Sequence, residues 1–191
     1  GGKGYDIIAT GGMGIGNTTT SSAVVSVLLG RDPEEVTGRG AGLTTEGLRR
    51  KVEAIRRAVR LNAPDPADAV DVLAKVGGLD IAGLAGVFLG GAICHIPIII
   101  DGFISSAAAL CAARIAPDCG DYMMPSHRSN EPAGGMVLEA LGLSPLIDCG
   151  MSLGEGSGAV AVLPLFEMGL EVYNRMSTFE EIQVEQYEEL T

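Results

Sequence analysis

Residues 5–19 read YDIIATGGMGIGNTT, and they decide the fold because a short apolar strand, a glycine turn and a helix start follow one another. Glycines after a strand let the backbone approach a ligand closely. The start of a helix offers free N–H groups and a positive dipole end, which attract an anion such as phosphate. The stretch matches neither GxxxxGK[ST] nor a clean GxGxxG. It predicts either a phosphate site or tight strand-to-helix packing alone.

The strand–turn–helix pattern recurs along the chain. Apolar strands are expected at residues 5–10, 97–101, 121–124 and 146–149. Helices are expected at residues 17–29, 44–61, 66–76, 80–92, 102–115, 132–141 and 158–169, with a loop at 31–43. An acidic stretch at residues 177–189 predicts a capped surface helix. Four strand–loop–helix units predict an α/β fold with a parallel sheet whose loops gather along one edge.

The composition excludes several classes of protein. With 24 acidic against 13 basic residues the net charge is -11, so neither nucleic acid nor an anionic membrane surface is an expected partner. The longest apolar run, residues 81–94, is too short to span a bilayer, and its small residues predict a buried helix. The cysteines are widely spaced without a CxxC pair, which indicates reduced thiols in a cytosolic protein.

The loop after the third expected strand, residues 126–131 (SHRSNE), concentrates polar chemistry. Its hydroxyl, imidazole, guanidinium and carboxylate groups could line a site, or could merely cap the helix that follows. His127 could act as a base. No Ser or Cys in a nucleophile-elbow context accompanies it, which disfavours hydrolysis by a catalytic triad.

The loop after the fourth expected strand, residues 152–158 (SLGEGSG), places one carboxylate between two glycines just before a helix. Glu155 is the best candidate for a general base, a role that is favoured by burial. The alternative is an acidic residue that is favourably placed at a helix N-terminus.

Three further polar residues each have two interpretations. Asp101 ends an expected strand and could hold a ribose or a cation, or could cap the next helix. Lys51 lies on a mostly solvated basic helix face, although it could reach a phosphate. His95 has no Cys or His at i+3 or i+4, so a semi-buried histidine is favoured over a metal ligand. The sequence predicts no metal site.

Five motifs, in their order and spacing, resemble the nicotinate-nucleotide-dimethylbenzimidazole phosphoribosyltransferases of cobalamin lower-ligand synthesis. They are GMGIGNTTT, GRGAGLT, PIIIDGFISSAAAL, SHRSNEPAGG and MSLGEGSGA, and the resemblance runs from residue 5 to about residue 176. It covers the C-terminal half, or slightly more, of a family member. It implies a Rossmann-like parallel sheet with helices on both faces. Residues 1–176 would then form the α/β core of a fragment of a longer chain, and residues 177–191 the C-terminal helix of a largely missing small helical domain.

The resemblance also implies an activity. Phosphoribose would pass from nicotinate mononucleotide to 5,6-dimethylbenzimidazole or a related base, which gives α-ribazole 5'-phosphate and nicotinate in a cytoplasmic homodimer without a cofactor. Glu155 matches the catalytic base of the family. The residues expected to contact the nucleotide phosphate, ribose or nicotinate are Met13, Gly14, Asn17, Lys51, Gly102, Ser129 and Leu153.

Gly12 departs from the family pattern. Family members commonly read GEMGIGNT at this loop, so a glutamate side chain, with its charge and hydrogen bond, is missing here. This departure leaves an alternative function open, namely a catalytically impaired nucleotide-binding fragment or a partner subunit of that family.

Overall fold

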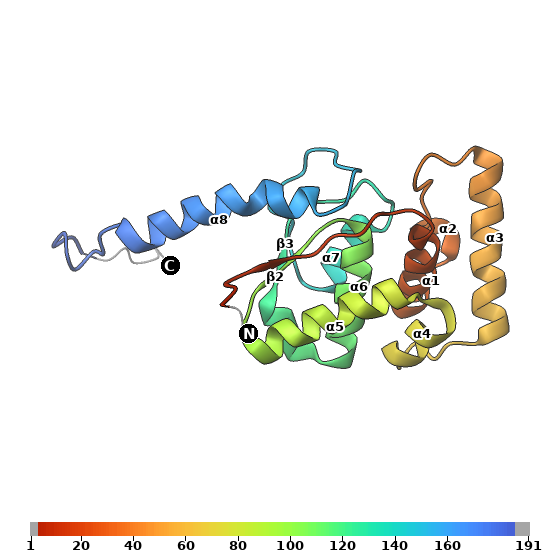
Figure 1. Ribbon diagram of the computed structural model, residues 1–191. Coiled ribbons are helices and arrows are strands. Elements are labelled where there is room, and N and C mark those ends of the chain that lie inside the picture. Colours follow the sequence, from red (N-terminus) through yellow and green to blue (C-terminus); the bar gives the residue numbers. More distant parts are fainter. Residues whose placement is uncertain (1–3, 186–191) are drawn as a thin grey trace, which may run out of the picture. The chain divides into compact units, whose positions relative to one another are not determined.

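The computed structural model describes residues 4–185 of the chain (Figure 1). The chain divides into two compact units, residues 1–161 and residues 162–191, and each is described by itself. The first unit holds the sheet and most of the helices. Helix α8 (Ser157–Arg175) begins in the first unit and continues in the second.

A parallel sheet lies in the first unit, as the sequence predicts. Its strands are β1 (Ile8–Ala9), β2 (Ile98–Ile100) and β3 (Met123–Pro125), in the order β1-β2-β3. Ile98 is paired with Ile8 on one side and with Met123 on the other. All three residues of β2 are buried. An unbroken run of isoleucines is typical of such a central strand, because both of its faces are covered. The expected α/β fold with a parallel sheet is confirmed.

The fourth expected strand, at residues 146–149, is wrong as a full strand. Only one parallel bridge forms, between His127 and Ile147, although the amides of Leu146 and Ile147 both donate to the carbonyl of Ser126. Leu146 is nearly half exposed, so this segment has no second apolar face to bury. Gly150 then turns the chain away with a positive φ of 66°.

The helices of the first unit follow one another in the predicted order, and most of them lie between the first two strands. They are α1 (Asn17–Leu29), α2 (Pro33–Val36), α3 (Thr45–Asn62), α4 (Ala69–Val76), α5 (Leu79–Cys94), α6 (Phe103–Ile115), the 3-10 helix η1 (Pro117–Tyr122) and α7 (Gly134–Ala140). Two of them were not expected. The short α2 interrupts the loop expected at 31–43, because Asp32 caps it and Pro33 suits its first turn. The 3-10 helix η1 delays the third strand to Met123.

The second unit differs from expectation at two places. Helix α8 continues past Gly169 to Arg175 and includes Pro164. The helix expected at residues 177–189 is wrong as far as residue 185, because residues 179–183 form turns. Gln183 adopts a left-handed φ of 57°, which ends the turns before they can propagate as a helix. Residues 186–189 lie outside the described part of the chain.

The core of the first unit forms around α1 and α6. Small residues of α6, Ala107 to Ala109 with Cys111 and Ala112, are fully buried and let neighbouring helices approach closely. Helix α6 contacts α1, α5 and β2, while α5 also contacts β2. This packing fixes the loops that follow β1, β2 and β3 relative to one another.

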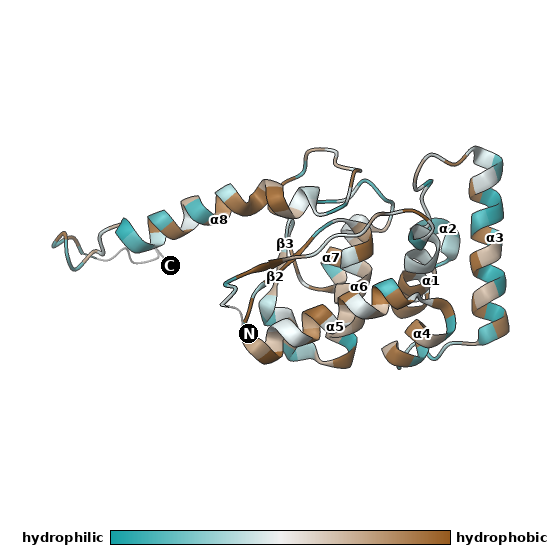
Figure 2. Ribbon diagram, viewed as in Figure 1, coloured by the Kyte–Doolittle hydropathy of each residue, from teal (hydrophilic) through white to brown (hydrophobic). Residues whose placement is uncertain are grey.

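Helix α5 is only half buried, contrary to the expectation of a buried helix. Ile81, Ala85, Phe88 and Gly91 face the core, whereas the exposed face includes Leu79, which is 94% exposed. Figure 2 shows the contrast between α5, largely brown, and the basic α3, which carries much teal. Within residues 4–185, no helix is both long and apolar enough to cross a membrane. His95, at the end of α5, is exposed rather than semi-buried and hydrogen-bonds the hydroxyl of Tyr122.

Candidate functional site

A cavity of about 520 Å³ opens where the loops after the strands meet. The loop after β1 contributes residues 12–15, the turn after β2 and the start of α6 contribute residues 101–105, and the loop after β3 contributes His127 and residues 129–132. Thr18, Leu48 and residues 37–41 and 151–154 complete the wall. Because the strands are parallel, their carboxyl ends share one edge, which is the usual place for a ligand in such sheets.

The loop after β1 packs directly against the loop that carries Glu155. A Cβ added to Gly11 would lie 2.5 Å from the amide nitrogen of Gly156, so position 11 has no room for a side chain. The amide of Glu155 donates to the carbonyl of Gly12 at 3.1 Å. Tight packing therefore explains Gly11, while the residues after it remain accessible from the cavity.

The start of α1 borders the cavity through Gly14, Ile15 and Thr18. Gly14 and Gly16 adopt positive φ values of 77° and 86°, which turn the backbone sharply into the helix. The positive end of the helix dipole thus faces the cavity wall. This arrangement suits an anionic group.

Lys51 supplies a buried cation immediately behind this wall. Its side chain is 7% exposed, and its Nζ donates to the hydroxyl of Thr18 and to the carbonyl of Gly38, both at 3.0 Å. Burial lowers the pKa of Lys51, and the nearby carboxylate of Glu131 partly offsets this effect. The interpretation of Lys51 as part of a solvated face is wrong, because its side chain is buried. Both residues that it hydrogen-bonds line the cavity.

The segment of residues 37–41 closes on Glu131. The amide of Gly40 donates to Oε1 of Glu131 at 3.2 Å, and a Cβ on Gly38 would overlap Oε2. Oε2 is buried and has no hydrogen-bond partner within residues 4–185, and the same holds for the hydroxyl of Thr37. Both residues line the cavity, although these two atoms are themselves closed off from it.

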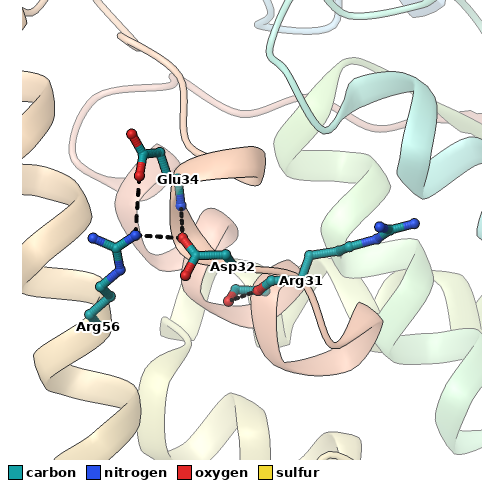
Figure 3. Close-up of polar contacts among 5 residues, drawn as sticks. Arg31, Asp32, Glu34 and Arg56 are labelled. Carbon is teal, nitrogen blue, oxygen red and sulfur yellow. Dashed lines mark hydrogen bonds and ion pairs between the residues drawn. The ribbon is translucent and has the colours of Figure 1, made fainter.

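Helix α2 anchors this segment to α3. The carboxylate of Asp32 accepts the amide of Glu34 at 2.8 Å and the guanidinium of Arg56 at 2.6 Å (Figure 3). Arg56 also reaches Glu34 Oε2 at 3.2 Å. The amide of Glu34 and the guanidinium of Arg56 hold the pKa of Asp32 below its usual value. These contacts lie just upstream of residues 37–41.

His127 is buried beside the cavity in one tautomer. The hydroxyl of Ser126 donates its single proton to the carbonyl of Ile100 at 2.6 Å, so its oxygen accepts from Nδ1 of His127 at 3.0 Å. This network assigns a proton to Nδ1. Nε2 lies near Gly102, 3.6 Å from where a Cβ of that residue would be.

Glu155 directly follows Gly154, which lines the cavity. It adopts a left-handed φ of 58°, and its side chain is exposed and does not line the cavity. The burial expected of a general base is therefore not supplied by residues 4–161. Its catalytic role stays a prediction.

The cavity is lined by five of the seven residues that the resemblance implies as contacts of the nucleotide: Met13, Gly14, Gly102, Ser129 and Leu153. Lys51 lies behind the wall, and Asn17 is not among the lining residues; its Nδ2 donates to Asp80 at 2.8 Å. The ligand contacts of all seven remain predictions. Sequence reasoning assigned no individual role to Thr18, Thr37 or Glu131. The GRGAGLT motif signals the segment that follows Thr37, but no local pattern shows that it closes on Glu131.

Within residues 4–185, no group of three or more His, Cys, Asp or Glu side chains is placed to hold a metal ion. All four cysteines are free, with Cys94 and Cys149 exposed and Cys111 and Cys119 buried. Burial raises the pKa of the Cys111 thiol to about 12.

Comparisons with known proteins match nearly the whole chain. A phosphoribosyltransferase family model matches residues 2–184. The nicotinate-nucleotide-dimethylbenzimidazole phosphoribosyltransferase of Ruminiclostridium cellulolyticum is 52% identical over 188 residues, which cover 98% of this chain and 53% of that protein. The enzyme of the same name from Escherichia coli K12 is 49% identical over 174 residues, which cover 91% of this chain and 48% of that protein.

A solved structure agrees. The crystal structure of CobT from Thermus thermophilus superposes with a TM-score of 0.89 at 42% identity, and the match covers 97% of this chain and 55% of that one. The chain spans about half the length of the curated relatives that it matches.

Proposed function

Since the chain belongs to the phosphoribosyltransferase family, we propose that it carries the nucleotide-binding and catalytic core of an enzyme that transfers phosphoribose from nicotinate mononucleotide to 5,6-dimethylbenzimidazole or a related base. The products are α-ribazole 5'-phosphate and nicotinate, in the synthesis of the lower ligand of cobalamin. One observation carries the proposal: the cavity unites the start of α1, the Lys51 contacts and the loop of Glu155.

The phosphate of the nucleotide binds at the start of α1. The helix dipole favours an anion there, and Lys51 adds a full positive charge behind Thr18 and Gly38. Lysine has three N–H donors, of which two are used within residues 4–185, so one remains for a phosphate oxygen. Fixing the phosphate positions the ribose for attack.

Glu155 accepts the proton of the attacking base. A bond forms between the base nitrogen and the anomeric carbon, while the bond from that carbon to nicotinate breaks and its electron pair neutralises the cationic ring. Attack from the face opposite the leaving group inverts β to α. The base nitrogen loses its proton during this step, and a carboxylate within hydrogen-bond reach lowers the barrier.

The other properties of the protein follow the same proposal. Residues 1–176 form the α/β core, and residues 177–191 belong to a small helical domain. The protein acts in the cytoplasm as a homodimer on small-molecule substrates, without a cofactor and without nucleic acid. Identity near 50% to enzymes over nearly the whole chain favours this function over the impaired subunit that Gly12 suggests.

Nicotinate release by the natural-length protein tests the proposal. Incubation with nicotinate mononucleotide and 5,6-dimethylbenzimidazole should release nicotinate, and Glu155→Gln should lower kcat by about 100-fold, because an amide cannot accept the proton. The control is Glu139→Gln, which changes an exposed carboxylate on α7 and should leave kcat unchanged. Absence of release with benzimidazole, purine and phenolic acceptors would contradict the proposed function.

A further inference from the structure

We propose that Asp101 is a positioning residue, which holds the backbone turn that carries Glu155 in place beside the cavity. This inference rests on the proposed function and adds a second acidic residue to it. Asp101 follows β2, the central strand, and is 2% exposed. It therefore extends directly from the buried central strand.

The carboxylate of Asp101 accepts three backbone N–H groups, one from the loop of Glu155 and two from the first turn of α8. Oδ2 accepts the amide of Gly156 at 2.9 Å. Oδ1 accepts the amides of Gly158 at 2.9 Å and Ala159 at 3.2 Å. Asp101 thus caps α8, which begins at Ser157, rather than the next helix, α6, whose cap makes no side-chain hydrogen bond.

The turn needs such support because its backbone is disfavoured. Gly154, Glu155 and Gly156 adopt successive positive φ values of 74°, 58° and 83°. The left-handed conformation is unfavourable for a residue with a Cβ, so Glu155 keeps it only when its surroundings hold it. Two hydrogen bonds do so on either side of its Cα: its own amide binds Gly12, and the next amide binds Asp101.

The start of α8 packs so closely against the carboxylate of Asp101 that position 158 has no room for a side chain. A Cβ on Gly158 would lie 2.9 Å from Oδ1 of Asp101 and would overlap Nδ1 of His127. Position 158 therefore has no side chain, which lets the start of α8 approach both groups. Because Asp101 also lines the cavity, one carboxylate links the cavity wall to the turn of Glu155.

Asp101→Asn in the natural-length protein tests the inference. The amide keeps the shape, but its NH2 group faces backbone donors and cannot accept from them. We expect kcat to fall about 10- to 100-fold, because the turn shifts, while KM for nicotinate mononucleotide stays within about twofold. In the Glu155→Gln background the same substitution should change kcat less than about twofold, because Asp101 acts through Glu155.

A matched control separates positioning from capping in general. Asp68 also accepts two backbone amides, those of Val70 and Asp71, at the start of α4. Asp68→Asn should leave kcat unchanged. If Asp101→Asn does not fold, Gly156→Ala supplies the second variant. Its Cβ would lie 3.5 Å from the carbonyl of Thr10, so only the positive φ disturbs the turn, and kcat should fall with KM unchanged.

Amide hydrogen exchange tests the positioning without any activity. Asp101→Asn should speed exchange at Gly156, Gly158 and Ala159, and unchanged exchange there overturns the inference even if the proposed function is wrong. An unchanged kcat in Asp101→Asn or Gly156→Ala overturns it as well, as does an equal loss of kcat with and without Glu155. Absence of nicotinate release by the unsubstituted protein counts against the proposed function alone.

Discussion

Gly11 and Gly12 are neighbours with opposite constraints. A Cβ at position 11 would collide with the backbone of Gly156, whereas a Cβ at position 12 would meet only Ile104 at 3.7 Å and Asn17 at 3.9 Å, which are ordinary contacts. Position 12 also has no positive φ. The structure therefore leaves space at position 12 for the glutamate that the family commonly carries there.

We expect Gly12→Glu to raise kcat by about tenfold or more, because it restores a charge beside the cavity without strain. Steady-state release of nicotinate by the natural-length protein measures this effect. The matched control is Gly11→Ala, which should lower the melting temperature, whereas Gly12→Glu should not. A kcat and a nucleotide affinity that both stay unchanged would contradict a role for that side chain.

Lys51 predicts a pH dependence of stability. Its pKa is lowered by burial from the ordinary value of 10.5, so in the window between the two values the unfolded chain binds more protons than the folded protein. The free energy of unfolding should therefore rise with pH through this alkaline window. Thermal melting across that range should show the slope, and Lys51→Met should remove it.

The same variant tests the phosphate site. Lys51→Met removes the buried positive charge, so calorimetry should show an affinity for nicotinate mononucleotide lower by about tenfold or more. Arg57→Met on the exposed face of α3 is the control and should bind normally. Equal binding by both variants would rule out a contact of Lys51 with the phosphate.

At the scale of elements, the contacts that anchor α2 to α3 should make the melting temperature depend on pH. Asp32 has a pKa below its ordinary 3.8, so its stabilising contribution is present above that value and is lost as pH falls through the lowered pKa. Asp32→Ala should lower the melting temperature at pH 7 by about 2 °C, because a helix cap is lost. At a pH below both pKa values the difference should vanish.

The control for this prediction is the neighbouring ion pair. Arg31 and Glu35 lie 3.6 Å apart and are both exposed, so Arg31→Ala should change the melting temperature little. Nucleotide KM should rise in Asp32→Ala, because the segment of residues 37–41 follows α2 directly. A melting difference that persists at low pH would contradict the assigned contribution of Asp32.

A helix or strand could be predicted from the sequence where a local pattern of residues alone specifies it. The run of isoleucines at 98–100 predicts a buried central strand, and the glycines and Asn17 predict the start of α1. The segment at 146–149 has a similar apolar run, yet it makes one bridge, since its outer face finds no cover. The half-exposed α5 fails for the same reason: hydropathy shows that a helix is apolar, but not whether a neighbour covers it.

At the scale of the whole molecule, the cavity depends on packing between helices that are distant in sequence. Helix α6 contacts both α1 and α5, which brings the loops after β1 and β2 together. The parallel order of the strands then places the third loop beside them. Parallel topology predicted this meeting of loops, but the segment at 37–41 is held beside them by contacts with Glu131 and Lys51, which no local pattern shows.

The sequence by itself determined the order of strand, turn and helix, since glycine turns, caps and apolar runs act over a few neighbouring positions. The resemblance of five motifs indicated the phosphoribosyltransferase family and implied five of the residues that line the cavity. Only the tertiary structure decided that Lys51 is buried, that Asn17 binds Asp80 and that Asp101 caps α8. Lys51 and Thr18 are 33 positions apart in the sequence, Asn17 and Asp80 are 63 apart, and Asp101 and Gly156 are 55 apart. Local patterns cannot specify such partners, because chain folding alone brings them within hydrogen-bond distance.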